Sequence, residues 1–201
     1  MNVSISAHFN DAIAAFDAAN NEDPNLENDN GLMTARELLY ARRLSDWVDK
    51  LEPHASEALR LAARCQHLCR WMIPRSDYPE GRAGYLKWRS TLAVFHANKA
   101  AEILKTAGYG EDTTKQVQNI NLKKNLRKEP EVQVMEDALC LVFLQYQVGE
   151  FAEKHDDEMV SNIIRKTWNK MSERGHNEAM KLDYSQRVQR LLQTALALKI
   201  I

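Results

Sequence analysis

Arginines and aromatic residues crowd one stretch of this sequence, between Arg60 and His96. Seven Arg or Lys residues lie between Arg60 and Arg89, against two acids, Asp77 and Glu80. Guanidinium groups bind phosphate oxygens in pairs, and aromatic rings offer stacking faces. Because the formal net charge of the chain is only -1, this positive charge is local. The stretch therefore predicts a site for an anionic ligand, without naming that ligand.

The residues expected to contact the anion come from this stretch and from one lysine beyond it. Tyr85 or Trp88 would stack against a ring, and the basic side chains would clamp phosphates. The predicted substrate-binding set is Arg70, Arg75, Arg82, Tyr85, Trp88, Arg89 and Lys123. Lys123 lies in a basic cluster with Lys124, Arg127 and Lys128, which could equally be a simple complement to the dipole at a helix C-terminus.

Three further residues, His67, His96 and Asp137, are candidates for a metal site or for acid–base chemistry. His67 lies at the edge of a predicted basic helix face that also carries Arg60, Arg64 and Trp71. His96 shares a face with Leu92 and Ala100, where a histidine is more often a satisfied core residue than a ligand. Asp137 projects from the apolar segment EDALCLVFL. A buried carboxylate is costly when unpaired, so Asp137 needs a metal, a cation or hydrogen bonds. The two interpretations are an ion pair with an arginine and a metal ligand.

Helical periodicity runs through nearly the whole chain, and the turn-forming residues are scarce, with 7 Gly and 5 Pro in 201 residues. We therefore expect one all-α domain, 1–201, a compact bundle of about seven or eight helices. Thr34 to Glu37 reads as a capping box, Ser56 as a helix cap and Gly108 as a C-terminal glycine. The predicted helices are 4–19, 34–51, 56–72, 85–107, 112–126, 131–151, 156 or 157–175, and 185–199.

The composition excludes several classes of protein. Three cysteines, Cys65, Cys69 and Cys140, lie in apolar helical patterns, which favours reduced thiols and a cytoplasmic protein. The first residues lack the pattern of a signal peptide, and no apolar run approaches the roughly 20 residues that span a membrane. The balanced charge gives no general attraction to nucleic acid. We expect a small phosphorylated ligand as the partner, and neither a membrane nor nucleic acid.

Several long motifs resemble the domain of unknown function family 4202 over nearly the whole chain. They are FDAANNEDPN (16–25), ELLYARRLSDW (37–47), ARCQHLCRWMIPR (63–75), YPEGRAGYLKWR (78–89), EDALCLVFL (136–144) and KTWNKMSERGH (166–176). Membership implies little chemistry, because the family is uncharacterised. The label "glutamyl-tRNA synthetase" that some members carry finds no support here, since the chain has no Gly-rich phosphate loop.

A more distant likeness is to the histidine–aspartate metal phosphohydrolase superfamily. These all-α proteins use a His, then a His-Asp pair, then an Asp, and a further histidine often starts the next long helix. His96 begins the similar segment HANKAAEIL, and Asp137 looks like the final aspartate. The chain departs from the pattern where Glu37 or Tyr40 replaces the first histidine. It departs again where Gln66-His67 replaces the pair.

The superfamily resemblance implies a divalent metal, Mn, Fe or Zn, on a mixed carboxylate–imidazole set. The implied ligands are Glu37, His67, His96 and Asp137, with His67 and Asp137 as catalytic residues. The protein would then be a metal-dependent phosphohydrolase acting on a nucleotide or small phosphorylated metabolite. The alternatives are a non-catalytic module that binds an anionic metabolite, nucleotide or RNA end, and a helical scaffold for an acidic partner.

Overall fold

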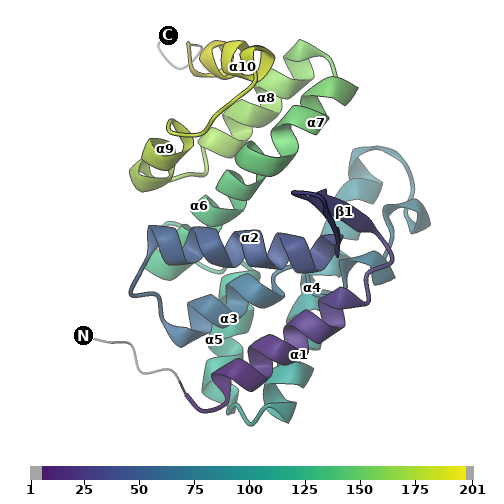
Figure 1. Cartoon of the computed structure of the whole chain (residues 1–201), viewed down its shortest axis with the longest axis vertical. Coiled ribbons are helices and arrows are strands. Elements are labelled where there is room, and N and C mark those ends of the chain that lie inside the picture. Colours follow the sequence, from purple (N-terminus) through teal and green to yellow (C-terminus); the bar gives the residue numbers. More distant parts are fainter. Residues whose placement is uncertain (1–5, 198–201) are drawn as a thin grey trace. The chain divides into compact units, whose positions relative to one another are not determined.

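The structure is a computed structural model that describes residues 6–197 of the 201-residue chain. It contains ten α-helices and one two-stranded hairpin within that range (Figure 1). The prediction of an all-α protein is confirmed, although the described residues form more helices than the seven or eight expected. The chain divides into two compact units, one ending at Val132 and the other beginning at Gln133.

The first unit holds five helices, the hairpin and the start of a sixth helix. They are α1 (Phe9–Asn21), β1 (Leu26–Asp29), β2 (Leu32–Ala35), α2 (Arg36–Leu51), α3 (Glu57–Cys65), α4 (Gly81–Thr106), α5 (Glu111–Asn121) and α6 (Pro130–Val142), which crosses the boundary. Helix α3 packs against α1, α2 and α5, and α4 packs against α5. Phe16, Leu44, Leu59, Leu61 and Leu104 are fully buried between these helices.

The hairpin lies mostly in the segment between the predicted helices 4–19 and 34–51. Its strands pair antiparallel, with Leu26 opposite Ala35 and Asp29 opposite Leu32. Asn30 and Gly31 form the turn with φ angles of 52° and 94°. Two consecutive positive φ angles are what a two-residue hairpin turn requires, and Asn-Gly is the dipeptide that adopts them most easily. This local signal was present in the sequence.

Helix α2 begins differently from the prediction. The expected capping box is wrong, because Thr34 belongs to β2 and Ala35 precedes the helix without a capping side chain. The main-chain N–H of Glu37 instead donates to Asp23 Oδ2, 3.1 Å away and 14 residues earlier. Asp23 is itself held by Asn25, whose main-chain N–H donates to Oδ1 at 2.9 Å. This distant cap fixes Glu37 in the first turn of α2.

Helix α3 starts as predicted, because the Ser56 hydroxyl accepts the main-chain N–H of Leu59 at 3.1 Å. It ends at Cys65, well before the predicted Met72. Cys69 adopts a left-handed φ of 55°, and its N–H donates to the side chain of Asn20 in α1 at 3.0 Å. The predicted shared face of Arg60, Arg64, His67 and Trp71 is therefore wrong, since His67 lies in the turn after the helix.

The loop before α4 is held by contacts of its own. The Arg75 guanidinium donates to the carbonyl oxygens of Tyr78 and Pro79 at 2.8 and 2.9 Å. Helix α4 begins at Gly81, earlier than predicted, and Gly84 lies so close to Pro79 that a Cβ atom would stand 1.9 Å from its carbonyl oxygen. Gly108 has a φ of 94° after α4, which confirms the predicted C-terminal glycine.

The second unit continues from α6 through a π-helical turn at Phe143–Gln147. The remaining helices are α7 (Val148–Lys154), α8 (Asp157–Trp168), α9 (Glu173–Ala179) and α10 (Gln186–Ala197). Of the two aspartates expected at the start of this helix, Asp156 is the cap of α8, because its side chain accepts the N–H of Met159 at 2.8 Å. The predicted helix ending at 175 is instead two helices, because Ser172 caps α9.

Helix α5 ends at Asn121 rather than 126. The predicted helical positions 4–5 and 198–199 lie outside the described residues. No helix within residues 6–197 is long and apolar enough to cross a membrane.

Candidate functional site

The first unit brings Glu37, His67 and His96 together, and we call these three residues the Glu37–His67–His96 cluster. Glu37 comes from α2, His67 from the turn after α3, and His96 from α4. Glu37 Oε2 lies 3.6 Å from His67 Nδ1, and the two imidazole ring centres are 5.8 Å apart. Tyr40 stacks on His67 with 4.2 Å between the ring centres. Three separate elements thus converge on one polar cluster.

Glu37 is the buried carboxylate of this cluster. Only 7% of the residue is exposed, and its Oε2 atom has no hydrogen-bond partner among the described residues. Burial raises the pKa of Glu37 to about 7, and the nearby Asp23 carboxylate adds to that rise, while Arg70 opposes it. A carboxyl group with such a pKa exchanges its proton near neutral pH, which is a property of general acids and bases.

His96 carries the second unpartnered atom. Its Nδ1 atom lies 2.8 Å from the carbonyl oxygen of Leu68, and because a carbonyl only accepts, Nδ1 holds the proton. The Nε2 atom of the neutral ring therefore has a lone pair, and it is buried without a hydrogen-bond partner. Burial, together with repulsion from a charged His67, lowers the pKa of His96 to about 3. At neutral pH this lone pair is available to a proton donor or a cation.

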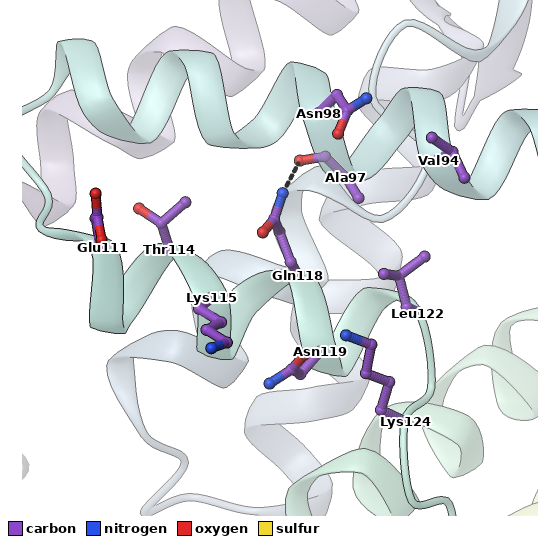
Figure 2. Close-up of a pocket in the computed structure, with 10 residues that line it drawn as sticks. All are labelled: Val94, Ala97, Asn98, Glu111, Thr114, Lys115, Gln118, Asn119, Leu122 and Lys124. Atoms are coloured by element: carbon purple, nitrogen blue, oxygen red, sulfur yellow. Dashed lines mark hydrogen bonds between the residues drawn. The ribbon is translucent and has the colours of Figure 1, made fainter.

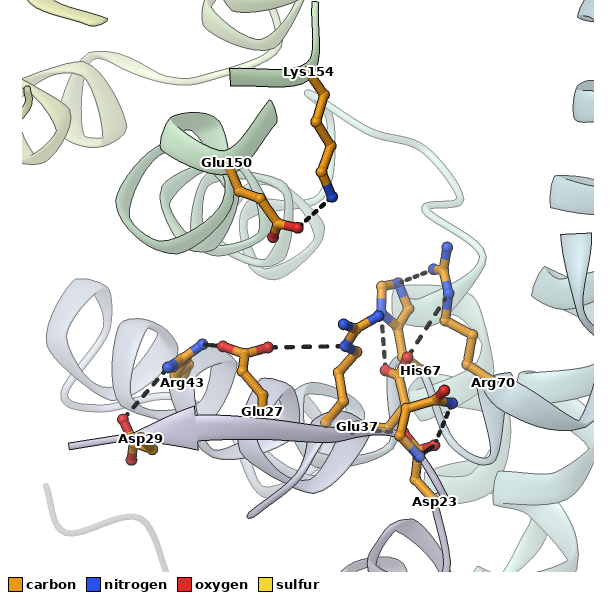
Figure 3. A network of polar contacts seen from close by, with 11 residues as sticks. Asp23, Glu27, Asp29, Glu37, Arg43, His67, Arg70, Glu150 and Lys154 are labelled. Carbon is orange, nitrogen blue, oxygen red and sulfur yellow. Dashed lines mark hydrogen bonds and ion pairs between the residues drawn. The ribbon is translucent and has the colours of Figure 1, made fainter. Parts of the chain in front are cut away.

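His67 lies between the Glu37 carboxylate and the Arg70 guanidinium (Figure 3). Its Nε2 atom is 3.4 Å from Arg70 Nη1, and because arginine has no acceptor, Nε2 must carry the lone pair. The proton then sits on Nδ1, which faces Glu37. Burial, with the positive charges of Arg70, Arg89 and Lys123, lowers the pKa of His67 well below its usual value. Both imidazoles are therefore neutral at pH 7.

Positive side chains border the cluster. Arg70 Nε lies 3.8 Å from Glu37 Oε1, and the Arg70 guanidinium covers the Trp88 ring at 4.9 Å. Arg89 and Lys123 lie close enough to His67 to affect its pKa, and Arg89 Nη1 also donates to the Tyr85 hydroxyl at 3.2 Å. The structure therefore places three of the predicted phosphate-binding cations, Arg70, Arg89 and Lys123, beside the cluster.

The other predicted substrate-binding residues differ in whether their side chains are already used in contacts within the protein. Arg75 uses its guanidinium to hold its own loop, as described above. Trp88 is only 8% exposed, and its Nε1 donates to the Ile73 carbonyl at 2.9 Å. Because Arg70 covers the Trp88 ring, the ring supports Arg70 and offers little surface for stacking against a ligand. Tyr85 is 42% exposed, and Arg82 is exposed with no contact to another described polar group. Their roles in binding stay predictions.

Asp137 belongs to the second unit, where neutral donors satisfy its carboxylate. Ser172 donates through its main-chain N–H at 2.7 Å and its hydroxyl at 2.5 Å, and Gln133 donates to Oδ1 at 3.0 Å. Within residues 6–197 no arginine pairs with Asp137, so the alternative of an arginine ion pair is wrong. The carboxylate instead joins α6 to the Ser172 cap of α9. Its role as a catalytic residue and metal ligand stays a prediction.

Sequence reasoning missed Asp23 as a member of the site. Asp23 is 3% exposed, holds the first turn of α2 through the Glu37 N–H, and raises the pKa of Glu37. The signal available in the sequence was the Asp-Pro dipeptide at 23–24, which favours a turn and a side chain bonded to nearby backbone. That signal marks the turn but gives no indication of Glu37.

The Glu37–His67–His96 cluster contains some of the donor atoms that a metal site needs. Glu37 Oε2 and His96 Nε2 are unpartnered, and neutral imidazole and carboxylate suit Mn, Fe or Zn. His67 offers its Nε2 to Arg70. Within residues 6–197, no three His, Cys, Asp or Glu side chains are grouped so that they could hold a metal ion. The cluster thus supplies suitable donors without a complete set of three in this arrangement.

The fold and the site together define a mostly helical protein with a buried histidine–glutamate cluster bordered by arginines. The family model for a domain of unknown function, DUF4202, matches residues 10–192, and the chain belongs to this family. No curated protein and no solved structure matches the chain significantly.

Proposed function

We propose that this protein is a metal-dependent phosphohydrolase that acts on a nucleotide or another small phosphorylated metabolite. The observation that carries the proposal is the pair of buried, unpartnered acceptor atoms, Glu37 Oε2 and His96 Nε2, beside Arg70. Unsatisfied buried acceptors are costly and rare, so they indicate a missing donor or cation. The cations that border the cluster favour an anion next to it. A metal ion and a phosphate group together meet both requirements.

The roles of the residues follow from their positions. Glu37 and His96 would hold the metal. When bound, a divalent ion lowers the pKa of a water molecule and polarises a phosphoryl oxygen. Arg70, Arg89 and Lys123 would neutralise the phosphate. If Arg70 turns toward the phosphate, His67 Nε2 is freed to accept a proton, and Glu37 next to Nδ1 stabilises the resulting imidazolium.

The likeness to the histidine–aspartate phosphohydrolases supports this proposal only in outline. The chain keeps a histidine at His96 and an aspartate at Asp137, but Gln66-His67 stands in place of the characteristic pair. Glu37 takes the place of a histidine ligand with a carboxylate, which is a chemically reasonable exchange for Mn, Fe or Zn.

A second candidate is an anion-binding module without catalysis. The observation that favours it is Arg70, whose guanidinium lies against both His67 Nε2 and Glu37 Oε1. An arginine in this position repels a metal ion and satisfies part of the negative charge. In this case the cluster would position Arg70 for a phosphate, and no metal would be required.

Metal content and hydrolysis separate the two candidates. The purified protein is stripped with a chelator, loaded with Mn, Fe or Zn, and assayed for bound metal and for phosphate release from nucleotides and sugar phosphates. His96→Asn keeps a donor near the Leu68 carbonyl and removes the Nε2 lone pair together with the outer part of the ring. It should abolish metal binding and hydrolysis. His176, which contacts the Trp168 carbonyl through Nε2 at 2.8 Å, provides the control His176→Gln.

The control should keep both properties. A wild-type protein that binds phosphates without metal and without hydrolysis would favour the binding module. Hydrolysis that persists in the metal-free protein would refute the metal-dependent reaction.

A further inference from the structure

A pocket of about 390 Å³ opens between α4 and α5 in the first unit (Figure 2). None of the residues assigned to the proposed reaction lines it. Its apolar part consists of Val94, Ala97 and Leu122, and its volume lies in the range of pockets that hold small metabolites. Val94 is 55% exposed, so an apolar surface faces solvent at the pocket rim.

The other residues that line the pocket are polar, and most of their side chains make no hydrogen bond or ion pair within residues 6–197. The lining contains two lysines, Lys115 and Lys124, and one acid, Glu111, so its net charge is positive. The side chains of Asn98 and Asn119 make no hydrogen bond within residues 6–197, and the two lysines make no ion pair there. Two free ammonium groups and two free carboxamides beside an apolar wall suit a ligand with one anionic group and one ring.

The backbone after α5 fixes one of these lysines at the pocket. The N–H groups of Lys123 and Lys124 bond to the carbonyl oxygens of Ile120 and Asn119, both at 2.9 Å, and close the end of the helix. Lys123 therefore takes a φ of 54°, a position where glycine is usual. In Figure 2, the Lys124 ammonium group lies near Asn119 and Leu122. A fixed turn, and not only a flexible side chain, thus presents this charge.

Gln118 fixes the opposite wall. Its side-chain amide donates to the main-chain carbonyl of Ala97 at 3.2 Å and ties α5 to α4 (Figure 2). Because this bond joins the two helices at the pocket, it helps to set the spacing between them before any ligand binds. A preformed pocket loses less entropy on binding than one that must be ordered.

We propose that this pocket binds a small phosphate monoester with an attached ring, such as a nucleoside monophosphate, at a site separate from the reaction cluster. The ring would lie on Val94 and Leu122, and the phosphate between Lys115 and Lys124. The pocket and the reaction cluster share elements: Ala97 follows His96 on α4, and Lys124 follows Lys123. A ligand in this pocket would therefore contact residues directly next to residues of the reaction cluster.

AMP is the probe for this proposal, with adenosine and ribose 5-phosphate as its two halves. The chelator-treated full-length protein, labelled with ¹⁵N, is titrated with each compound while the side-chain amide signals of Asn98 and Asn119 are followed. AMP should shift these signals, and each half should bind at least about tenfold more weakly. Lys115→Met combined with Lys124→Met keeps the aliphatic chains and should weaken AMP binding at the pocket by about tenfold or more.

Lys105→Met is the matched control, because Lys105 is an exposed lysine on α4 outside the pocket. It should leave the AMP affinity unchanged. Arg70→Gln separates this proposal from the proposed function, since it should impair the reaction cluster and leave the Asn98 and Asn119 shifts intact. Equal AMP affinity in the double variant and the control would overturn the proposal, and so would shifts confined to the reaction cluster or no shift at all.

Discussion

The raised pKa of Glu37 predicts an unusual dependence of stability on pH. Burial raises this pKa from 4.5 to about 7, and the side chain is only 9% exposed, so solvent screens the effect little. Between these two pH values the folded protein keeps the proton and the unfolded chain releases it. The free energy of unfolding therefore falls as the pH rises through this window. A shift of about 2.5 units corresponds to about 3 kcal/mol in total.

Glu37→Gln removes this titration while keeping the size of the side chain. The free energy of unfolding of wild type and variant is measured by urea denaturation of chelator-treated protein between pH 5 and 8. The variant should gain about 2.5 kcal/mol relative to wild type across that range. Other titrating groups are present in both proteins, so the difference between the two curves isolates Glu37.

Glu57→Gln is the control for this measurement. Burial raises the pKa of Glu57, but hydrogen bonds from Ser6 and Tyr109 outweigh it and lower the pKa below the usual value. Its contribution to stability is present above the unfolded pKa and is lost only as the pH falls below it. The difference between this variant and wild type should therefore be flat from pH 5 to 8. Parallel curves for Glu37→Gln and wild type would refute the reasoning.

Three further predictions concern residues that hold the site in place, each measured by urea denaturation. Arg75→Ala should cost about 1–3 kcal/mol, because it leaves two loop carbonyls without their donor, while exposed Arg82→Ala should change stability by less than about 0.5 kcal/mol. Asp137→Asn should cost about 1–3 kcal/mol, because the N–H and the hydroxyl of Ser172 bond to different carboxylate oxygens and one of these becomes an NH2 group. Gly84→Ala should cost at least about 1–3 kcal/mol, because its Cβ would overlap a backbone oxygen at 1.9 Å.

Each of these three stability predictions would be contradicted by one specific result. Equal stability of the Arg75 and Arg82 variants would mean that Arg75 does not hold its loop. An Asp137 variant as stable as wild type would show that the carboxylate does not act through the Ser172 cap. A Gly84 variant with unchanged stability would contradict the close approach of α4 to the preceding loop.

The sequence allowed correct prediction of features that depend on neighbouring residues. Ser56, Asp156 and Gly108 each act within a few positions of a helix end, and the structure confirms all three. The start of α2 was predicted wrongly because its cap, Asp23, lies 14 residues away across a hairpin. The early end of α3 depends on a bond between Cys69 and Asn20, which are 49 residues apart. No local pattern carries such contacts.

Contacts between distant residues also determine which charged side chains are available at the candidate site, and the sequence does not show these contacts. The sequence shows an excess of arginine between Arg60 and Arg89, but not which guanidinium groups are already used. Arg64 makes a two-bond pair with Asp17 at 2.6 and 2.7 Å, and Arg60 lies 3.1 Å from Asp49. With Arg75 bound to its own loop, part of the predicted positive surface is structural. The cations beside the cluster could be identified only from the folded chain.

Arg70 links the chemistry of the cluster to the arrival of an anion. Its guanidinium contacts Glu37 Oε1, His67 Nε2 and the Trp88 ring, and its charge lowers the pKa of both Glu37 and His67. A phosphate that draws the guanidinium away would raise both pKa values, because a stabilising charge leaves the carboxylate and a repulsive charge leaves the imidazole. Binding of the anion would thus increase the proton affinity of His67 at the moment when its Nε2 becomes accessible. That coupling is what a proton acceptor in phosphate ester hydrolysis needs, and an arginine held only for stability would not provide it.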